Sequence, residues 1–252
     1  MHRNRASESS SGGMSANLMI QTRPEEISLW TTSRAKRLFD MAVVLASTPV
    51  ALPLLLLIAL LVRISSTGPV LFRQVRLGRF GEPFAIFKFR TMQHAPGDYR
   101  DAIASASADR ITRFGRILRW LKLDELPQLL NVLVGEMSLV GPRPLVPEQQ
   151  LEPLQCRPGI TGLATLAFAR EDSIFALIPL AILPEYYRKT ILPAKQRLDA
   201  SYMKRATLIS DLKLILDTSL GRWGTYARSV ASNSADIGIA DRMPEVQGVT
   251  PQ

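Results

Sequence analysis

The residues with the clearest chemical potential are two adjacent carboxylates, Asp124 and Glu125, within the run Leu-Asp-Glu-Leu-Pro-Gln-Leu that begins at Leu123. Proline disrupts the interior of a helix but is tolerated in its first turn, so Pro127 predicts that a helix begins near Asp124. Free N–H groups and the positive end of the helix dipole favour anions there and keep a carboxylate ionised. Such a carboxylate beside a phosphate site could act as a nucleophile or a metal ligand. The alternative is that Asp124 is only the N-cap of the helix.

The composition narrows the chemistry that can surround these carboxylates. The 252 residues include one cysteine, Cys156, and two histidines, His2 and His94, and the formal net charge is +9. Neither an intramolecular disulfide nor a cysteine or histidine metal site can be built, so a reducing compartment and a hard cation on carboxylate oxygens are expected. The basic balance indicates nucleic acid, an anionic membrane face or a phosphorylated substrate as partner.

Two arginines lie in stiff, proline-containing segments. Arg143 is held between Pro142 and Pro144, and Arg157 precedes Pro158 in the run Arg-Pro-Gly-Ile-Thr-Gly. A guanidinium fork binds phosphate or carboxylate groups through two hydrogen bonds, so a rigid arginine suits an anionic ligand. A structural salt bridge is the alternative for each.

A short β-hairpin is predicted across residues 70–91, because apolar residues alternate there and Gly78, Gly81 and Pro83 provide turn signals. Lys88 and Arg90 alternate with phenylalanines, so both cations should share one face of a strand. That face either contacts the substrate or is simply solvated.

Basic residues recur every third position from Arg110 to Lys122, with apolar residues between them at helical spacing. This arrangement predicts an amphipathic helix that lies either on an anionic bilayer or in solvent. Its end leads directly to Asp124, which would bring Arg119 near a phosphate bound there.

Residues 38–62 form a 25-residue apolar run with a single charge, Asp40, and this length suffices to cross a bilayer. Pro49 lies near its middle, preceded by Ser47 and Thr48, and Pro53 follows one turn later. The prolines free backbone carbonyls and invite a sharp bend, while the hydroxyls can satisfy freed groups.

Both flanks of this run are basic, which favours keeping both on the cytoplasmic side. We therefore expect a hairpin that enters and leaves the membrane by one face. An ordinary span and a buried core helix are the alternatives. The expected organisation is a mobile leader (1–33), a re-entrant membrane helix (34–63), a cytoplasmic catalytic domain (64–219) and a loose tail (220–252). No secretory signal and no internal repeat are evident.

Together these segments resemble the bacterial sugar transferase family, the monotopic polyprenyl-phosphate phosphoglycosyl transferases. The resemblance covers about residues 35–218, and its elements occur in the family's order. They are Lys-Arg-Leu-Phe-Asp from Lys36, Thr-Pro from Thr48, Lys-Phe-Arg-Thr-Met from Lys88, the Asp124 run, Met-Ser-Leu-Val-Gly-Pro-Arg-Pro from Met137 and the Arg157 run. Without further leading membrane helices, the chain is expected to be the small form.

The resemblance implies an α+β fold, with a re-entrant helix-break-helix followed by a mainly helical cytoplasmic domain that carries a small β-hairpin. It implies Mg²⁺-dependent transfer of a sugar-1-phosphate from a UDP-sugar to polyprenyl (undecaprenyl) phosphate. By this analogy Asp124 is the nucleophile and forms a phosphosugar-aspartyl intermediate, while Glu125 assists metal binding or proton transfer, both being metal-ligand candidates. The positions matching substrate contacts are Lys88, Arg90, Arg119, Arg143, Arg157 and Asp199. The membrane break corresponds to Ser47, Thr48 and Pro49.

The implied location is the bacterial cytoplasmic (inner) membrane, with the active site on the cytoplasmic face. The reaction would be the first membrane step of exopolysaccharide, O-antigen (lipopolysaccharide) or glycoprotein glycan synthesis. No nucleic acid is expected as partner; a homo-oligomer and downstream glycosyltransferases stay open. The chain departs from the family after Gly162, at residues 163–172, so the sugar is left open, as is the role of the apolar stretch Ile174 to Leu183. The rival interpretations are a membrane-tethered scaffold and a nucleic-acid-binding regulatory protein that uses the basic face.

Overall fold

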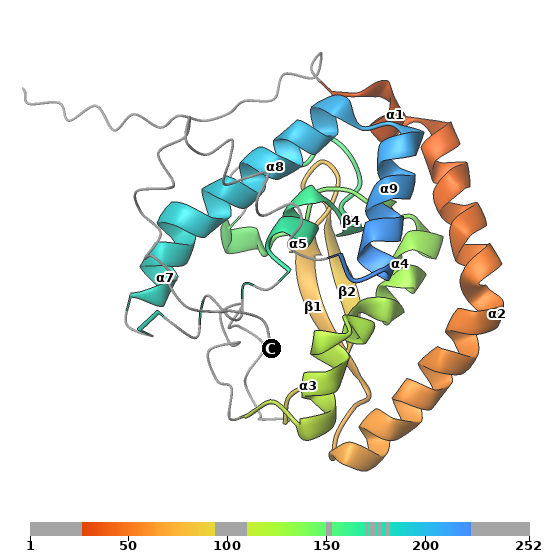
Figure 1. The fold of residues 1–252 in the computed structure, drawn as a ribbon, viewed down its shortest axis with the longest axis vertical. Coiled ribbons are helices and arrows are strands. Elements are labelled where there is room, and N and C mark those ends of the chain that lie inside the picture. The colour runs from red at the N-terminus through yellow and green to blue at the C-terminus, as the bar shows by residue number, and fades with distance from the viewer. Residues whose placement is uncertain are drawn as a thin grey trace, which may run out of the picture.

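The computed structural model describes residues 27–93, 110–149, 153–169, 171, 175, 178–179 and 182–222. Helices predominate in these residues and surround two small β-sheets, as the α+β expectation requires (Figure 1). In chain order the elements are α1 (Leu29–Thr32), α2 (Arg34–Ser65), β1 (Leu71–Leu77), β2 (Pro83–Phe89), α3 (Arg113–Trp120), the 3₁₀ helix η4 (Leu123–Gln128), α4 (Leu129–Val134), β3 (Ser138–Val140), the 3₁₀ helix η5 (Pro147–Gln149), β4 (Gly159–Thr161), α5 (Leu163–Ala167), α7 (Leu183–Tyr186), the π-helical turn η6 (Tyr187–Ile191), α8 (Leu192–Arg205) and α9 (Leu208–Ser219).

Helix α2 is continuous over 32 residues, with Pro49 and Pro53 inside it. The predicted helix-break-helix is therefore not confirmed as an interruption of the helix. The hydroxyls of Ser47 and Thr48 both donate to the carbonyl of Val44, at 2.8 and 2.9 Å. Such bonds back to the preceding turn bend helices. Figure 1 shows α2 curved, with its concave side towards the rest of the molecule.

By length and composition α2 could cross a membrane, and only 11% of its most apolar window is buried inside the molecule. Its outer face exposes large apolar side chains, such as Val50 at 76% exposure. The opposite face packs on the domain at two places. Val44 belongs to one core cluster, while Ile58 and Val62 join Phe89 in a second. Both halves of the long helix therefore rest on the same domain.

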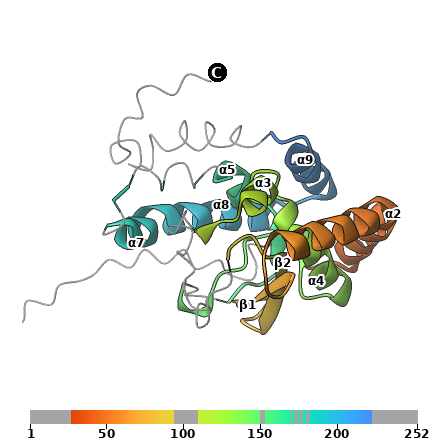
Figure 2. The same ribbon diagram turned by 90° about the horizontal axis from the view of Figure 1, so that it is seen from below.

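The predicted hairpin is confirmed: β1 and β2 pair antiparallel, with Leu71 opposite Phe89 and Leu77 opposite Pro83. Phe84 and Ile86 of β2 are buried in the core, as their alternation predicted. The hairpin lies on one side of the molecule (Figure 2), and β2 packs against η4.

A second sheet joins two of the proline-containing segments. Strands β3 and β4 are parallel, and Val140 pairs with Thr161. A Cβ atom on Gly159 would lie 2.1 Å from the backbone nitrogen of Gly141, so only glycine permits this approach. The backbone that leads to Arg143 is thereby fixed against β4.

A buried polar network fastens the first turns of α2 to the domain. The Lys36 ammonium lies 2.5 Å from an Asp211 oxygen, and both side chains are at most 5% exposed. Asp211 also accepts from Trp30 Nε1 at 2.8 Å and from the Tyr202 hydroxyl at 2.7 Å. Close by, Asp40 accepts from the Ser138 hydroxyl at 2.7 Å, at the start of β3. The network therefore connects α1, α2, β3, α8 and α9.

Helices α7 and α8 extend to the side opposite α2 (Figure 2). The predicted leader (1–33) lies mostly outside the described residues, but its last part forms α1, which bonds to α8 through Ser28 N–H and Met203 O at 2.8 Å. The described fold thus begins before the expected boundary. Most of the predicted tail (220–252) and of the apolar stretch 174–183 lies outside the described residues, but Leu183 is buried at the start of α7.

Candidate active site

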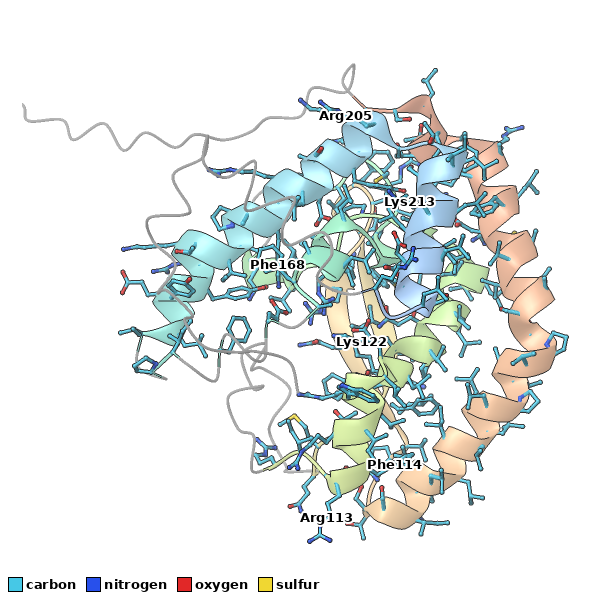
Figure 3. All side chains as sticks on the ribbon, viewed as in Figure 1. Arg113, Phe114, Lys122, Phe168, Arg205 and Lys213 are labelled. Atoms are coloured by element: carbon cyan, nitrogen blue, oxygen red, sulfur yellow. The ribbon has the colours of Figure 1, made fainter. Side chains whose placement is uncertain are left out.

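The two carboxylates are presented by η4, directly after a tight turn at Lys122. Lys122 has a left-handed backbone (φ 58°), which is unusual for a residue other than glycine, and joins α3 to η4 (Figure 3). The predicted helix start near Asp124 is present as a 3₁₀ segment that contains Pro127, and α-helical geometry begins only at Leu129. Asp124 is 8% exposed, so the carboxylate is enclosed within the fold.

Glu125 is held by two cations from different elements. Lys88 Nζ of β2 lies 2.5 Å from Glu125 Oε1, and Arg143 NH2 lies 3.7 Å from the same oxygen. Burial alone would raise the pKa of Glu125, but the charges of Lys88 and Arg143 hold that pKa at about 2. Glu125 is therefore ionised at neutral pH and is a weak base.

Asp124 differs from its neighbour in its electrostatic surroundings. Burial and the adjacent Glu125 charge raise the pKa of Asp124, against the opposing effect of Lys88, Lys122 and Arg119. Its Oδ1 atom is buried and has no hydrogen-bond partner. The helix N-terminus is thus not the only influence on this carboxylate, because its burial and the adjacent Glu125 charge both raise its pKa. An incoming cation or donor would find Oδ1 free.

Arg143 and Asp199 are joined through the backbone. The Arg143 N–H donates to Asp199 Oδ2 at 3.2 Å, which ties the proline-flanked loop to α8. Burial raises the pKa of Asp199 to about 7, and its Oδ1 atom has no hydrogen-bond partner. Asp199 therefore positions the loop that carries Arg143.

Arg119 of α3 completes the basic surroundings of Asp124. Its Nε donates to Thr91 Oγ1 at 3.0 Å, and its charge lowers the pKa of Asp124. The α3 surface around it matches the predicted amphipathic helix: Arg113 and Arg116 are exposed, Leu118 is buried, and Ile117 and Trp120 are 52% and 72% exposed.

Two predicted contact residues make their hydrogen bonds elsewhere. Arg90 does not share the site of Lys88; its NH2 donates to the carbonyl and hydroxyl oxygens of Ser66, at 2.6 and 2.9 Å. Arg157 Nε donates to the carbonyl of Gly135 at 2.7 Å, beyond the end of α4. The structure thus brings together Lys88, Arg119, Asp124, Glu125, Arg143 and Asp199.

A further group beside Arg143 was not predicted. Lys195 of α8 forms an ion pair with Glu171, and its ammonium lies 5.5 Å from the Phe168 ring and 5.2 Å from the Tyr187 ring (Figure 3). Both Glu171 and Tyr187 act on the charge of Arg143. The one hint of this group in the sequence was the departure from the family at residues 163–172. That departure marked the segment that carries Glu171 but did not indicate its ion pair with Lys195.

The carboxylate oxygens of Asp124 and Glu125 are chemically suitable ligands for Mg²⁺. Within the described segments no group of three or more His, Cys, Asp and Glu side chains could hold a metal. Mg²⁺ is commonly bound by one or two carboxylates together with substrate phosphates and water. Asp124 offers a buried, unpartnered carboxylate oxygen, whereas the Oε1 of Glu125 is already engaged by Lys88.

The chain is similar to known proteins. The bacterial sugar transferase family profile matches residues 31–223. The UDP-glucose:undecaprenyl-phosphate glucose-1-phosphate transferase of Caulobacter vibrioides is 42% identical over 197 residues, or 73% of this chain and 67% of that protein.

Two further relatives differ in length. The undecaprenyl-phosphate glucose phosphotransferase of Komagataeibacter xylinus is 36% identical over 214 residues, which are 79% of this chain but 37% of that protein. The exopolysaccharide production protein PSS of Rhizobium leguminosarum bv. phaseoli is 37% identical over 202 residues, or 73% of this chain and 92% of that protein. The family match spans every element from α2 to α9, and the chain belongs to the bacterial sugar transferase family.

Proposed function

We propose that this protein transfers a hexose-1-phosphate from a UDP-sugar to polyprenyl phosphate at a membrane surface. The observation that carries the proposal is a buried carboxylate, Asp124, with an unpartnered oxygen beside the Lys88–Glu125–Arg143 group. A nucleophile surrounded by cations suits a substrate whose reacting atom is a phosphorus with anionic oxygens. The names of the Caulobacter and Komagataeibacter relatives make UDP-glucose the first donor to test.

The reaction would proceed by double displacement. An oxygen of ionised Asp124 attacks the phosphorus that bears the sugar, the bond from that phosphorus to the bridging oxygen breaks, and UMP leaves. A phosphate oxygen of the polyprenyl phosphate then attacks the same phosphorus and releases Asp124. One site thereby handles two bulky, charged substrates in turn.

The remaining residues would bind and orient the phosphates. Glu125, ionised at neutral pH, holds Lys88 and Arg143 in place rather than transferring a proton. Arg143 presents a planar fork to the transferred phosphoryl oxygens. Mg²⁺, held by Asp124 and the donor phosphates, would neutralise charge on the phosphoryl group.

Helix α2 is the proposed membrane anchor, and we place it in the inner membrane with the domain on the cytoplasmic face. A helix of 32 residues is about 48 Å long when straight, more than the ~30 Å of the hydrocarbon core. Its two halves both pack on the domain, through Val44 and through Val62, which supports re-entry over a full span.

The decisive experiment incubates the protein with UDP-glucose and Mg²⁺ but without acceptor. One phosphoglucose should remain on the protein, observed by intact mass, and peptide mapping should place it on Asp124. Adding polyprenyl phosphate should remove it and sustain UMP release. If no UDP-sugar of a broad panel gives UMP with acceptor, the proposed function is wrong.

Variants separate the roles of the carboxylates. Asp124→Asn should abolish both the adduct and turnover, because a neutral amide cannot supply the attacking oxygen anion. Glu125→Gln should slow turnover without moving the adduct, and chelation of Mg²⁺ should suppress adduct formation. Glu82→Gln, an exposed carboxylate on the hairpin, is the matched control and should behave as wild type. UMP release that requires both substrates, without an adduct, would overturn the covalent step alone.

A further inference from the structure

The side chain of Arg90 is buried with two nitrogens that have no hydrogen-bond partner. Arg90 is 7% exposed, and only its NH2 is engaged, by Ser66. Its Nε and NH1 atoms are buried and unpartnered. A guanidinium keeps its charge in proteins and carries five N–H donors, and leaving buried donors unsatisfied is costly. A capping role at the end of α2 explains the bonds to Ser66 but not the two free nitrogens.

The charge around Arg90 is also unbalanced. Burial lowers its pKa, and the nearest charge that adds to this effect is another cation, Arg63, in the last turn of α2. Among the described residues, no ion pair joins Arg90 to a carboxylate. Two cations close enough to act on each other, one of them with unpartnered N–H groups, match an anion with several oxygens, such as a phosphate.

The surroundings indicate that this anion is attached to a hydrocarbon chain. Around the buried contact of Val62, Phe89 and Leu118, the ends of α2 and α3 expose apolar side chains. These are Leu61 (39% exposed), Ile64 (72%), Ile117 (52%) and Trp120 (72%). Figure 3 shows Arg113 and Phe114 of α3 beside this end of α2. Arg90 directly follows Phe89, so its buried guanidinium belongs to the residue next to this apolar cluster.

The site is also connected to the reacting carboxylate. Thr91, the next residue after Arg90, accepts a hydrogen bond from Arg119, and the charge of Arg119 acts on Asp124. Arg119 therefore links the segment that carries Arg90 to the reacting carboxylate.

We propose that Arg90, together with Arg63, binds the phosphate of the polyprenyl phosphate acceptor at the C-terminal end of α2. This inference rests on the proposed function and assigns the acceptor its docking point, distinct from the donor-binding group around Arg143. The acceptor's hydrocarbon chain lies along the exposed apolar faces of α2 and α3, and its phosphate reaches Asp124 past Arg119.

The test measures binding of a short-chain polyprenyl phosphate to the full chain in nanodiscs of zwitterionic lipid. Arg90→Gln should raise Kd by about ten- to a hundredfold, the effect of losing a charged hydrogen-bond partner. Arg63→Gln, an exposed position, should raise it about three- to tenfold. Arg116→Gln, an exposed charge on α3, is the matched control and should leave Kd within about twofold of wild type. UDP-glucose binding should be unchanged in all three variants.

Binding experiments with other ligands identify which part of the polyprenyl phosphate the site recognises. Polyprenol without phosphate should bind wild type and Arg90→Gln equally weakly, and inorganic phosphate should compete only at much higher concentration. Equal competition by short-chain phosphatidylglycerol would overturn the acceptor assignment in favour of a phospholipid headgroup.

Comparing the affinity of the variants with the turnover of wild type distinguishes failure of this inference from failure of the proposed function. Equal polyprenyl phosphate affinity of wild type and Arg90→Gln would overturn the inference while leaving the proposed function intact. If the wild-type protein binds no polyprenyl phosphate and turns over no UDP-sugar, the proposed function itself is wrong. If Arg90→Gln does not fold, the affinity for polyprenyl phosphate is measured for Arg63→Gln and Arg90→Lys instead. An unchanged affinity in both variants would overturn the inference.

Discussion

Arg143 contacts two carboxylates by different atoms. Its NH2 lies 3.7 Å from Glu125 Oε1, while its backbone N–H donates to Asp199 Oδ2. Arg143→Lys retains the charge and the backbone bond but loses the planar fork that fits phosphoryl oxygens. We expect kcat/KM for the donor to fall at least about tenfold, which corresponds to ~1.4 kcal/mol, with an unchanged thermal midpoint. Arg116→Lys is the control, and near-wild-type kinetics for Arg143→Lys would make Arg143 a structural residue.

Asp199 predicts a pH dependence of stability. Its pKa is about 7 in the folded state because it is buried, against ~3.9 in an unfolded chain. Between these values the folded state binds a proton that the unfolded state does not. The unfolding free energy should therefore fall as the pH rises from about 4 to about 7, and the contribution should be constant above that.

The measurement is the thermal midpoint in detergent across this range, for wild type and Asp199→Asn. The neutral amide has no proton to release, so the variant should lose less stability than wild type between pH 4 and pH 7. Parallel curves would show that Asp199 titrates normally.

At the scale of single residues, the sequence predicts which residues share a site where their type and stiff surroundings already limit their position. Lys88, Arg119, Arg143 and Asp199 were predicted and lie around the two carboxylates. The strand alternation does not place Arg90 beside Lys88, because β2 ends at Phe89 and the next side chain lies beyond the strand. The raised pKa of Asp124 was not predictable either, since burial and a neighbouring like charge are properties of the folded site.

Among the elements, α2 is fastened to the domain by a buried ion pair at its first turn. The Lys36–Asp211 pair is almost completely buried, whereas the Lys189–Glu185 pair has side chains 68% and 59% exposed. Breaking a buried ion pair by removing one partner costs about 3–5 kcal/mol. An exposed i,i+4 pair contributes far less, because solvent screens its charges.

Lys36→Met should accordingly lower the free energy of unfolding by about 3 kcal/mol, measured by denaturant unfolding in detergent, and Lys189→Met should have little effect. Because Asp40 and Ser138 connect the same turn of α2 to β3, Lys36→Met should also reduce turnover. Equal effects of the two substitutions would show that the anchor does not hold α2.

The sequence predicted the β1–β2 hairpin because its strands are long enough to show alternation and its turn residues are distinctive. Strands β3 and β4 have three residues each, too few for a periodic signal, although their glycines allow the close approach. The break in α2 was expected from Pro49 and Pro53, but proline bends a helix without ending it when neighbouring groups bond the freed turn.

For the whole molecule, the central question is how α2 meets the bilayer. Both halves of α2 pack on one domain, and a domain cannot lie on both sides of a membrane. Cysteines at Leu29, before the helix, and at Thr67, after it, should therefore both react with an impermeant maleimide from the cytoplasmic side. The native Cys156 is 2% exposed and should stay unlabelled in the folded protein. Labelling of the two positions from opposite sides would establish a full span.

The prolines provide the complementary test of the same topology. Pro49→Leu combined with Pro53→Leu restores two backbone donors and removes the clashes that bend α2. A straight helix of about 48 Å is longer than the ~30 Å hydrocarbon core, so without the bend α2 can cross the bilayer completely. We expect the double variant to move Thr67→Cys out of reach of the cytoplasmic reagent and to lose turnover together with that change. Retained cytoplasmic labelling with full activity would mean that the contacts of α2 with the domain, and not the prolines, determine its return to the same face.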